Sequence, residues 1–253
     1  MIDLHSHILP GLDDGAQTME QALAMARAAV DEGIRIVAAT PHHLSGSYLN
    51  PARAIQAELA VFNERLRAEN IPLTVICGQE LRVNASFLEE LFAGGALPLN
   101  GSRYLLIELP AAAIPANLED IVHELQVAGY VPIIAHPERN LAIAEQPDQL
   151  ARLVELGALS QLTTHSLCGR FGGKLQRLSL ELCRRNLVHV LASDAHDAQR
   201  RSYLMGEAYS LVRRKLGDRA EAYYRGNAQA VVDNRAIEAA VDIAGRRKRF
   251  IWR

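Results

Sequence analysis

Residues 1–15, MIDLHSHILPGLDDG, contain a short apolar run that ends in two histidines separated by one residue. In a β-strand, residues i and i+2 project from the same face, so His5 and His7 would point toward one place. Two acidic residues, Asp13 and Asp14, follow a few positions later. Imidazole and carboxylate groups gathered at the end of a strand are typical of a metal site. This stretch therefore predicts a first strand that delivers ligands to a metal ion.

Apolar runs similar to the first recur six times, and the stretches between most of them have helical character. Thr18 and Gln21 have the spacing of a capping box, and Gly33 is a typical helix end. Residues 50–70 predict another helix, with Asn50 as its N-cap and Pro51 at the first helical position. The alternation of strands and helices predicts an α/β fold with a parallel sheet. The seven runs cover residues 1–7, 34–43, 73–81, 104–110, 131–139, 159–167 and 189–196.

The carboxyl ends of the seven runs carry a second regularity, because each has a polar or metal-binding side chain there. Successive members of this series lie 28 to 38 residues apart, about the length of one strand–helix unit. In a closed barrel, all these ends meet on one face, whereas an open doubly wound sheet uses only a few strands at a switch point. The even spread favours a (β/α)7 barrel of the TIM type. The series is His5, His42, Glu80, Glu108, His136, His165 and Asp194.

Composition and charge set limits on the kind of protein. The net charge of -2 argues against a nucleic-acid-binding surface. The apolar runs are far shorter than the roughly 20 residues that span a bilayer, and no secretory signal is recognisable, so we expect no transmembrane segment. Three cysteines form neither a CxxC pair nor an even-numbered disulfide framework, which predicts a reducing compartment and hence the cytoplasm. They are Cys77, Cys168 and Cys183.

Domain organisation is predicted to be simple. No linker or low-complexity segment divides residues 1–253, so we expect a single domain. A basic tail, at about residues 245–253, carries Phe250, Ile251 and Trp252. Such a tail fits contact with an acidic partner, a neighbouring subunit or a membrane surface, but a solvated tail that packs one aromatic ring is the favoured interpretation.

Nine side chains are candidate metal ligands on these grounds. Mixed imidazole and carboxylate ligation without cysteine suits Mn, Fe or Zn, and nine ligands suffice for two or three ions. The four carboxylates would repel one another in an empty pocket, whereas three divalent cations and a bridging hydroxide would leave a small positive charge that suits an anionic ester. The candidates are His5, His7, Asp14, His42, Glu80, Glu108, His136, Asp194 and His196.

An ordered set of short motifs resembles the PHP (polymerase and histidinol phosphatase) superfamily. Within it, the chain is most similar to the CpsB/CapC-type bacterial protein-tyrosine phosphatases associated with capsule and exopolysaccharide synthesis. The resemblance extends over essentially the whole chain and implies a distorted (β/α)7 TIM-like barrel, the PHP fold. The motifs are HSH (5–7), GLDDGA (11–16), TPHH (40–43), GQE (78–80), LIELP (106–110), AHPERN (135–140) and ASDAH (192–196).

The resemblance also implies a role for each candidate residue. Three divalent metal ions are expected, with Mn²⁺ favoured and Fe or Zn as alternatives. A first ion would be held by His5, His7, Glu80 and Asp194. Glu80 would bridge to a second ion that is completed by Glu108 and His136. Asp14, His42 and His196 would hold a third and share in catalysis.

Arg139 matches the phosphate-contacting arginine of the family, and its alternative role is a loop salt bridge with Glu138. The implied reaction is attack of a metal-activated hydroxide on phosphorus, in line with the leaving phenolate. The implied substrate is a phosphotyrosine protein, such as the tyrosine-containing tail of a bacterial tyrosine kinase. An oligomer is compatible with the sequence.

Other interpretations remain beside this one. A phosphatase of a small phosphomonoester, as in the histidinol phosphatase branch, is the nearer alternative, and a non-catalytic metal-binding PHP module is the other. A thiol-based tyrosine phosphatase is set aside, because no arginine stands six residues after any cysteine. The scarcity of lysines, with none at a predicted strand end, disfavours a lysine-bridged amidohydrolase. We expect His165 to have a structural role or to support the metal ligands from behind, and we expect His43, His123 and His189 to lie outside the site.

Overall fold

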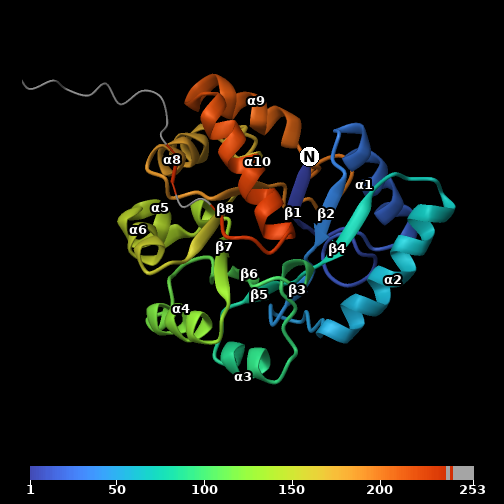
Figure 1. Cartoon of the computed structure of the whole chain (residues 1–253), viewed down its shortest axis with the longest axis horizontal. Helices are drawn as coiled ribbons and strands as arrows, with labels where there is room; N and C mark the ends of the chain where they lie inside the picture. Colours follow the sequence, from blue (N-terminus) through green and yellow to red (C-terminus); the bar gives the residue numbers. More distant parts are fainter. Residues whose placement is uncertain (238–239, 242–253) are drawn as a thin grey trace, which may run out of the picture.

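A computed structural model describes residues 1–237, 240 and 241 of the chain, and Figure 1 shows it. Strands and helices alternate along the chain, as the sequence pattern predicts. The predicted basic tail at 245–253, with Phe250, Ile251 and Trp252, lies outside the described residues. The strands are β1 (Ile2–Ser6), β2 (Ile36–Ala39), β3 (His42–His43), β4 (Thr74–Cys77), β5 (Glu80–Arg82), β6 (Tyr104–Glu108), β7 (Val131–Ala135), β8 (Leu159–Thr163) and β9 (Val190–Ala192).

Most helices lie outside the strands, around their circumference, and one, α10, lies across one end of them (Figure 1). Short 3₁₀ turns at Leu99–Gly101 and Pro137–Arg139 complete the regular structure of the described residues. The helices are α1 (Met19–Asp31), α2 (Ala52–Ala68), α3 (Phe87–Phe92), α4 (Leu118–Val127), α5 (Leu141–Glu145), α6 (Asp148–Glu155), α7 (Thr164–Leu167), α8 (Gly173–Arg184), α9 (Met205–Leu216) and α10 (Asp218–Val232).

The strands pair in parallel in two sheets, of order β1-β2-β4 and β3-β5-β6-β7-β8-β9. The second and third predicted runs each supply two strands, one to each sheet. Pro41, which has no N–H to donate, lies between β2 and β3. Gly78 lies between β4 and β5, where a Cβ would approach the side chain of Leu99 to 2.7 Å. Both runs therefore bend and continue from one sheet into the other.

The two sheets also meet between β1 and the end of β9. Ser6 and Ala195 form a parallel bridge, and the His7 N–H donates a hydrogen bond of 2.8 Å to the Ala195 carbonyl. The Asp194 N–H donates to the His5 carbonyl at 2.9 Å. These contacts close the ring of strands only near its carboxyl end. The α/β fold with parallel strands is confirmed, and its barrel is distorted.

Two apolar clusters hold this arrangement together. The larger one lies between the strands and the surrounding helices. The smaller one fills the interior of the barrel, with Leu4, Leu106 and Ile133 from the strands. Ala228 and Val231 of α10 belong to the same cluster, so α10 covers the amino-terminal end of the strands. The carboxyl-terminal end is left for polar side chains.

Helix ends follow the predicted signals with one exception. α1 has Thr18 as its N-cap, whose side chain accepts from the Gln21 N–H, and Gly33 follows the helix at φ +81°. For α2, however, the N-cap is Pro51, and the prediction that Asn50 caps this helix is wrong. Asn50 is buried, and its side-chain amide donates to the carbonyls of Leu12 and His42, at 2.8 Å each. Asn50 therefore makes hydrogen bonds to residues distant in the sequence instead of capping the helix that follows it.

Among the helices that the structure describes, none has the length and apolar character needed to cross a membrane.

Candidate metal centre

The nine candidate ligands come together at the carboxyl end of the strands. Parallel pairing places His42 directly beside Glu80 in neighbouring strands. Most of the nine are buried, and Asp14 is the most exposed, with 48% of its side chain accessible. Functional atoms of seven of them form three overlapping groups, and within each group the atoms lie within 4.8 Å of one another. The groups are His5–His7–Glu80, His42–Glu80–Glu108 and His7–Asp14–His42–His196.

The first group is centred on the Nε2 atoms of His5 and His7, which lie 3.2 Å apart. Glu80 Oε2 is 3.3 Å from the His5 atom and 3.4 Å from the His7 atom. Asp194 Oδ1 approaches the same two nitrogen atoms, at 3.5 and 3.3 Å respectively. Two imidazoles and two carboxylates thus surround one point, in the combination that the family resemblance implies for a first ion.

The second group shares Glu80 with the first. Glu80 Oε1 lies 2.8 Å from His136 Nε2, and Glu80 Oε2 lies 2.9 Å from His42 Nδ1. Glu108 is near both rings, with its oxygens 3.9 Å from the His136 nitrogen and 3.7 Å from the His42 nitrogen. Glu80 Oε2 thus faces both the first group and His42, while Oε1 faces His136, so this carboxylate is placed to bridge the two groups.

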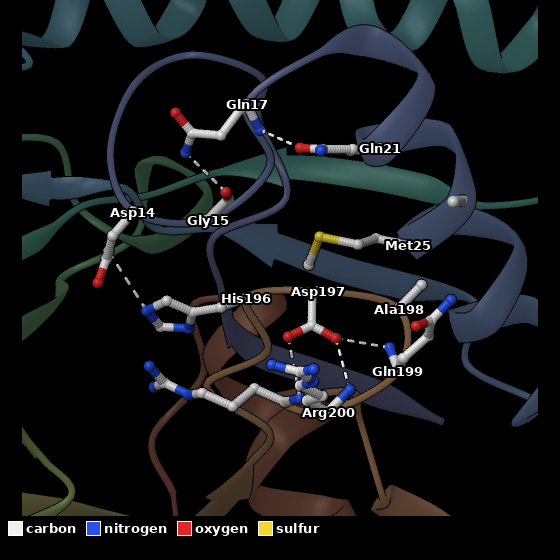
Figure 2. Close-up of a pocket in the computed structure, with 12 residues that line it drawn as sticks. Asp14, Gly15, Gln17, Gln21, Met25, His196, Asp197, Ala198, Gln199 and Arg200 are labelled. Carbon is white, nitrogen blue, oxygen red and sulfur yellow. Dashed lines mark hydrogen bonds and ion pairs between the residues drawn. The ribbon is translucent and has the colours of Figure 1, made fainter.

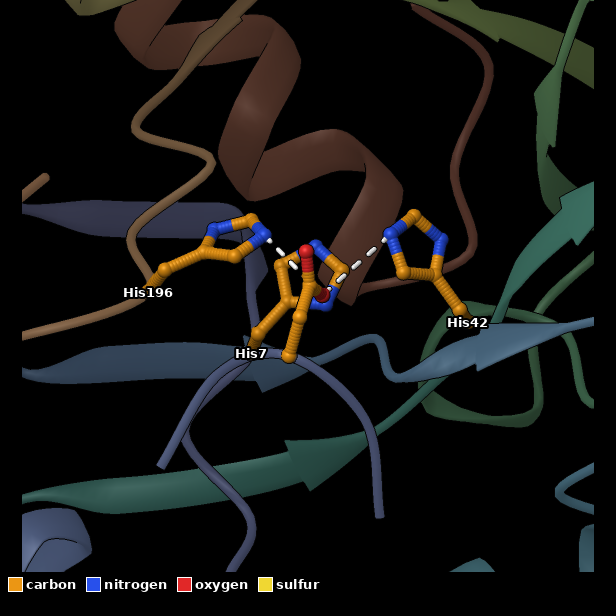
Figure 3. Close-up of side chains that lie close together, drawn as sticks. His7, His42 and His196 are labelled. Carbon is orange, nitrogen blue, oxygen red and sulfur yellow. Dashed lines mark ion pairs between the residues drawn. The ribbon is translucent and has the colours of Figure 1, made fainter. Parts of the chain in front are cut away.

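The third group lies nearest to solvent. Asp14 Oδ1 is 3.4 Å from His196 Nε2, as Figure 2 shows, and 3.5 Å from His42 Nε2. His42 and His196 lie on opposite sides of His7 in Figure 3. The ring of His7 lies 3.9 Å from that of His196 and 4.6 Å from that of His42, measured between centroids. His42 thus faces two groups, with Nδ1 in the second and Nε2 in the third.

Several histidines are oriented by groups behind them. The Nδ1–H of His7 donates to Asp13 Oδ2 at 2.6 Å, and that of His5 donates to Gln161 Oε1 at 3.0 Å. The Nδ1–H of His196 donates to the Asp194 carbonyl at 2.9 Å. These acceptors place the proton on Nδ1 and leave the Nε2 lone pair directed at the centre. The geometry is that of supported metal ligands.

The loop between β1 and α1 brings both aspartates to this position. The loop folds back against His7 at Gly15, where a Cβ would lie 2.1 Å from the His7 carbonyl oxygen. The Ala16 N–H then donates to that oxygen at 3.1 Å. Asp13 also accepts from the N–H groups of Gly15 and His42, at 2.9 and 3.0 Å. The close backbone approach admits only glycine, so local sequence and site geometry are linked here.

The charges of the centre perturb one another strongly. Burial by itself would raise the pKa of Glu80, but the imidazoles of His5, His136 and His42 hold it well below its usual range. Burial and the neighbouring Glu80 charge raise the pKa of Glu108 to about 7. Burial disfavours the charged form of His7, yet contact with Asp13 raises its pKa well above the ordinary value. Opposite charges compensate each other incompletely in this centre.

The donor set fits divalent cations. His42 Nδ1 and Glu80 Oε2 lie 2.9 Å apart, and Glu108 Oε2 lies 2.8 Å from Arg82 Nη2, yet none of these buried atoms makes a hydrogen bond of regular geometry. Such orphaned atoms cost free energy unless something else satisfies them. Because all three belong to one ligand group, a cation between them would satisfy them together. Nitrogen and carboxylate oxygen donors without sulfur suit Mn, Fe or Zn.

Two arginines border the centre through Asp194. Arg139, in the turn after β7, donates from Nη1 to Asp194 Oδ2. Arg201 donates from Nη2 to the same oxygen at 2.9 Å. Among the described residues Arg139 has no salt bridge to Glu138, whose buried carboxylate instead accepts from the Thr163 N–H at 3.2 Å. Asp194 thus presents Oδ1 to the histidines and Oδ2 to the arginines.

Five residues near the centre escaped the analysis of the sequence. The sequence pattern marks Asp13 only as a neighbour of Asp14, and it favours His165 over Gln161 as the polar residue of its run. Arg201 follows the ASDAH motif by five positions, a spacing with no local meaning. The other two are Arg82, which pairs with Glu108 at 2.8 Å, and Tyr48, whose ring stacks on His42 at 5.8 Å.

The remaining histidines lie outside the three groups. The Nε2–H of His43 donates to Glu90 at 3.2 Å. His165 lies in α7, after the end of β8, and its ring stacks on Phe171 at 5.6 Å. His123 is exposed on α4, and His189 is buried just before β9.

The thiols offer no alternative nucleophile. Burial raises the pKa of Cys183 to about 12, and burial together with Glu207 raises that of Cys168 to about 12. Burial also raises the pKa of Cys77. A thiol with such a pKa stays protonated near neutral pH and is a poor nucleophile.

A ring of parallel strands with a histidine- and carboxylate-rich centre at its carboxyl end defines the class: an α/β barrel protein with its site on the face typical of such barrels. The family model for "Capsular polysaccharide synthesis, CpsB/CapC" matches residues 1–233. The chain therefore belongs to the CpsB/CapC family.

Individual relatives agree with this assignment. The tyrosine-protein phosphatase YwqE of Bacillus subtilis is 43% identical over 94% of this chain and 93% of its own length. The putative tyrosine-protein phosphatase CapC of Staphylococcus aureus is 36% identical over 95% of this chain and 94% of its own.

Solved structures extend the comparison to the fold. One from work on YwqE of Bacillus subtilis and CpsB of Streptococcus pneumoniae, described as unique metal-dependent tyrosine phosphatases, matches with a TM-score of 0.92 and 43% identity. It covers 94% of this chain and 96% of the other. The lactonase Lmo2620 of Listeria monocytogenes matches at a TM-score of 0.50 and 10% identity, over 93% and 92%, and shares the fold only.

Proposed function

We propose that this protein is a metal-dependent protein-tyrosine phosphatase that hydrolyses phosphotyrosine in the regulation of capsule or exopolysaccharide synthesis. The observation that carries the proposal is the convergence of nine candidate ligands: seven form three overlapping groups, His136 and Asp194 lie against them, and Arg139 borders the centre. The names of the relatives support the same activity. The cytoplasm is the proposed location.

The ligand roles follow the resemblance, with one addition. His5, His7, Glu80 and Asp194 would hold a first divalent ion, and Glu80, Glu108 and His136 a second. Asp14, His42 and His196 would hold a third, and His42 also reaches the second group through Nδ1. We propose Mn²⁺ for these positions, with Fe or Zn as alternatives.

Bound divalent cations would lower the pKa of water and provide a hydroxide nucleophile near neutral pH. The side chains of the centre hold their positions in advance, because Asp13 and Gln161 fix the rings of His7 and His5. Preorganised groups contribute most when charge develops on the reacting phosphoryl group. Asp14, His42 and His196 lie on the side that solvent reaches first, so we propose that they share in catalysis there.

Arg139 is the residue that we propose to bind the phosphate. Its side chain is 35% exposed, and its guanidinium contacts Asp194 through Nη1, which leaves other N–H groups for a ligand. A planar guanidinium can form paired hydrogen bonds to phosphate oxygens. A hollow of about 90 Å³ lies beside it, bordered by Glu108, His136 and Asn140. A phosphoryl group bound there would be within reach of both the arginine and the centre.

Two alternatives differ in substrate or in activity. A phosphatase of a small phosphomonoester would use the same centre, and a non-catalytic module would bind metal without turnover. The proposed partner is a phosphotyrosine protein, such as the tail of a bacterial tyrosine kinase, and self-association of the chain is compatible with this function.

The test is hydrolysis of an aryl phosphate by the purified protein with added Mn²⁺, followed by a panel of phosphotyrosine peptides and sugar phosphates. We expect activity that a chelator abolishes and that favours phosphotyrosine. His136→Ala should remove most turnover while the circular dichroism spectrum is unchanged. Arg139→Ala should raise KM more than it lowers metal content. Full activity of His136→Ala, or a preference for sugar phosphates, would contradict the proposal.

A further inference from the structure

A hollow of about 610 Å³ opens beside the centre, on the side of Asp14 and His196 (Figure 2). Its other walls come from α1 and from residues 197–201 of the loop that follows β9. The volume lies within the roughly 300–1,000 Å³ that small-molecule sites occupy. A phosphate group held at the centre needs no such additional space, so the hollow requires a separate explanation.

The walls combine apolar and amide surface. Met25 and Ala198 contribute apolar atoms, and Gln17, Gln21 and Gln199 contribute side-chain amides. The wall is fixed to the loop that carries the ligands, because Gln17 Nε2 donates to the carbonyls of Asp13 and Gly15 at 2.8 Å each. Alternating apolar and hydrogen-bonding groups are what a peptide segment presents and what it requires of its binding surface.

The charged side chains that line the hollow differ in whether they already have hydrogen-bond or ion-pair partners. The carboxylate of Asp197 accepts from the backbone N–H groups of residues 199, 200 and 201, at 2.7, 2.5 and 3.2 Å. Asp14 faces two histidines of the centre, and Arg201 is bound to Asp194. Arg200 is exposed and has no ion pair with another described residue. Asp14 and Asp197 keep their negative charge, and Asp197 lies within electrostatic reach of Arg200; Arg200 is the cation of the hollow that has no ion pair among the described residues and can form one with a ligand.

We propose that this hollow binds the residues that flank the phosphotyrosine in a polypeptide substrate, and that Arg200 selects an acidic side chain among them. The inference rests on the proposed phosphatase function and assigns its substrate class. The hollow shares Asp14 and His196 with the centre, so a chain whose phosphotyrosine occupies the centre continues directly into it. A small phosphomonoester would leave it empty. Arg200 is a specificity-determining residue in this scheme, remote from the reacting atoms.

The experiment compares three substrates: a phosphotyrosine peptide with glutamate on both sides, the same peptide with glutamine, and p-nitrophenyl phosphate. Wild type should prefer the glutamate peptide. Arg200→Ala should raise KM for that peptide roughly three- to fivefold, the effect of a partly exposed ion pair, with kcat unchanged. It should leave the other two substrates unaffected. Arg200→Lys should restore most of the preference, and Arg200→Glu should reverse it.

The matched control is Arg184→Ala, which removes an exposed arginine near the end of α8, away from this hollow. Equal effects of Arg200→Ala on all three substrates, or none on any, would overturn the inference. Absence of p-nitrophenyl phosphate hydrolysis by wild type would instead refute the phosphatase function. In that case, fluorescence polarisation with the labelled peptides tests the hollow by binding alone. Tighter binding of the glutamate peptide that Arg200→Ala abolishes would support an acidic-peptide site. Equal binding of the two peptides would overturn it.

Discussion

The two ends of this barrel are built from the same strands and have opposite chemistry. At the amino end, Leu4, Leu106 and Val231 pack in an apolar interior that α10 closes. At the carboxyl end, the last residues of the strands and the loops after them gather four carboxylates and five imidazoles. One residue, Ile107, separates Leu106 from the candidate ligand Glu108 on β6. One strand can therefore contribute to stability with one residue and to a reactive centre with the next on the same face.

The two ends of the barrel contribute to the free energy of folding with opposite signs. Apolar burial stabilises a fold by roughly 25 cal/mol per Å², whereas burying charges is costly unless they are well paired. In this protein the costly part is concentrated at one end. The other end and the layer beneath the helices compensate for it.

The largest expected effect tests the carboxyl end. Glu80→Gln keeps the shape of the side chain but removes the charge shared by two ligand groups. We expect kcat to fall by roughly 10³-fold or more, about 4 kcal/mol of transition-state stabilisation, with metal content reduced. Steady-state kinetics and metal analysis measure both. Glu90→Gln, on α3, is the control, and a Glu80→Gln protein with normal turnover would refute the ligand role.

The second prediction tests the amino end. Leu106→Ala removes a fully buried side chain from the barrel interior, so the free energy of unfolding should fall by about 2–5 kcal/mol. Urea denaturation measures this loss. Leu106 is paired in register with Glu80 but supplies no ligand atom, so kcat of the folded protein should fall far less than in Glu80→Gln. If turnover falls in parallel with stability, the two ends are coupled and the contrast drawn above is wrong.

The third prediction uses a titratable group at the amino end. His189 is buried just before β9, its Nδ1 accepts from the Ser160 N–H at 3.1 Å, and burial lowers its pKa to about 4. The unfolded chain, with a pKa near 6.5, binds more protons between pH 6.5 and 4. The free energy of unfolding should therefore fall with pH through this window, by up to about 3 kcal/mol.

His189→Asn keeps a hydrogen-bond acceptor for Ser160 but cannot titrate there. The variant should lose less stability than wild type between pH 7 and 4, in denaturation measured with chelator present throughout. His123→Asn changes an exposed histidine on α4 and should leave the pH dependence of wild type intact. Parallel pH profiles of wild type and His189→Asn would show that His189 makes no such contribution.

The smallest expected effect concerns a side chain that supports a candidate ligand from behind. Gln161→Leu removes the acceptor that orients His5, and loss of such support typically costs about 10- to 100-fold in metal affinity. Titration of the metal-free protein with Mn²⁺ measures the change. Saturating metal should restore most of kcat, unlike in Glu80→Gln. Unchanged affinity would mean that the ring of His5 is held by packing alone.

Much of the fold followed from local patterns. Strands, helix ends and the even spacing of strand-end ligands are readable because periodicity and capping depend on neighbouring residues. The breaks at Pro41 and Gly78 were missed, although both residue types were visible, because each acts through contact with another strand or turn. The wrong N-cap at Asn50 has the same origin, since two carbonyls distant in sequence bind its side chain.

The candidate site, like the fold, was only partly predictable from the sequence. The candidate ligands and their order along the chain, from His5 to His196, were predicted from the sequence alone, because a parallel barrel brings strand ends together wherever they lie in the chain. Tertiary structure decided which partners each ligand has. It placed Gln161 behind His5, both arginines on Asp194, and His42 between two groups. Those contacts depend on the distances between strands and on side-chain directions, and no spacing in a linear chain contains that information.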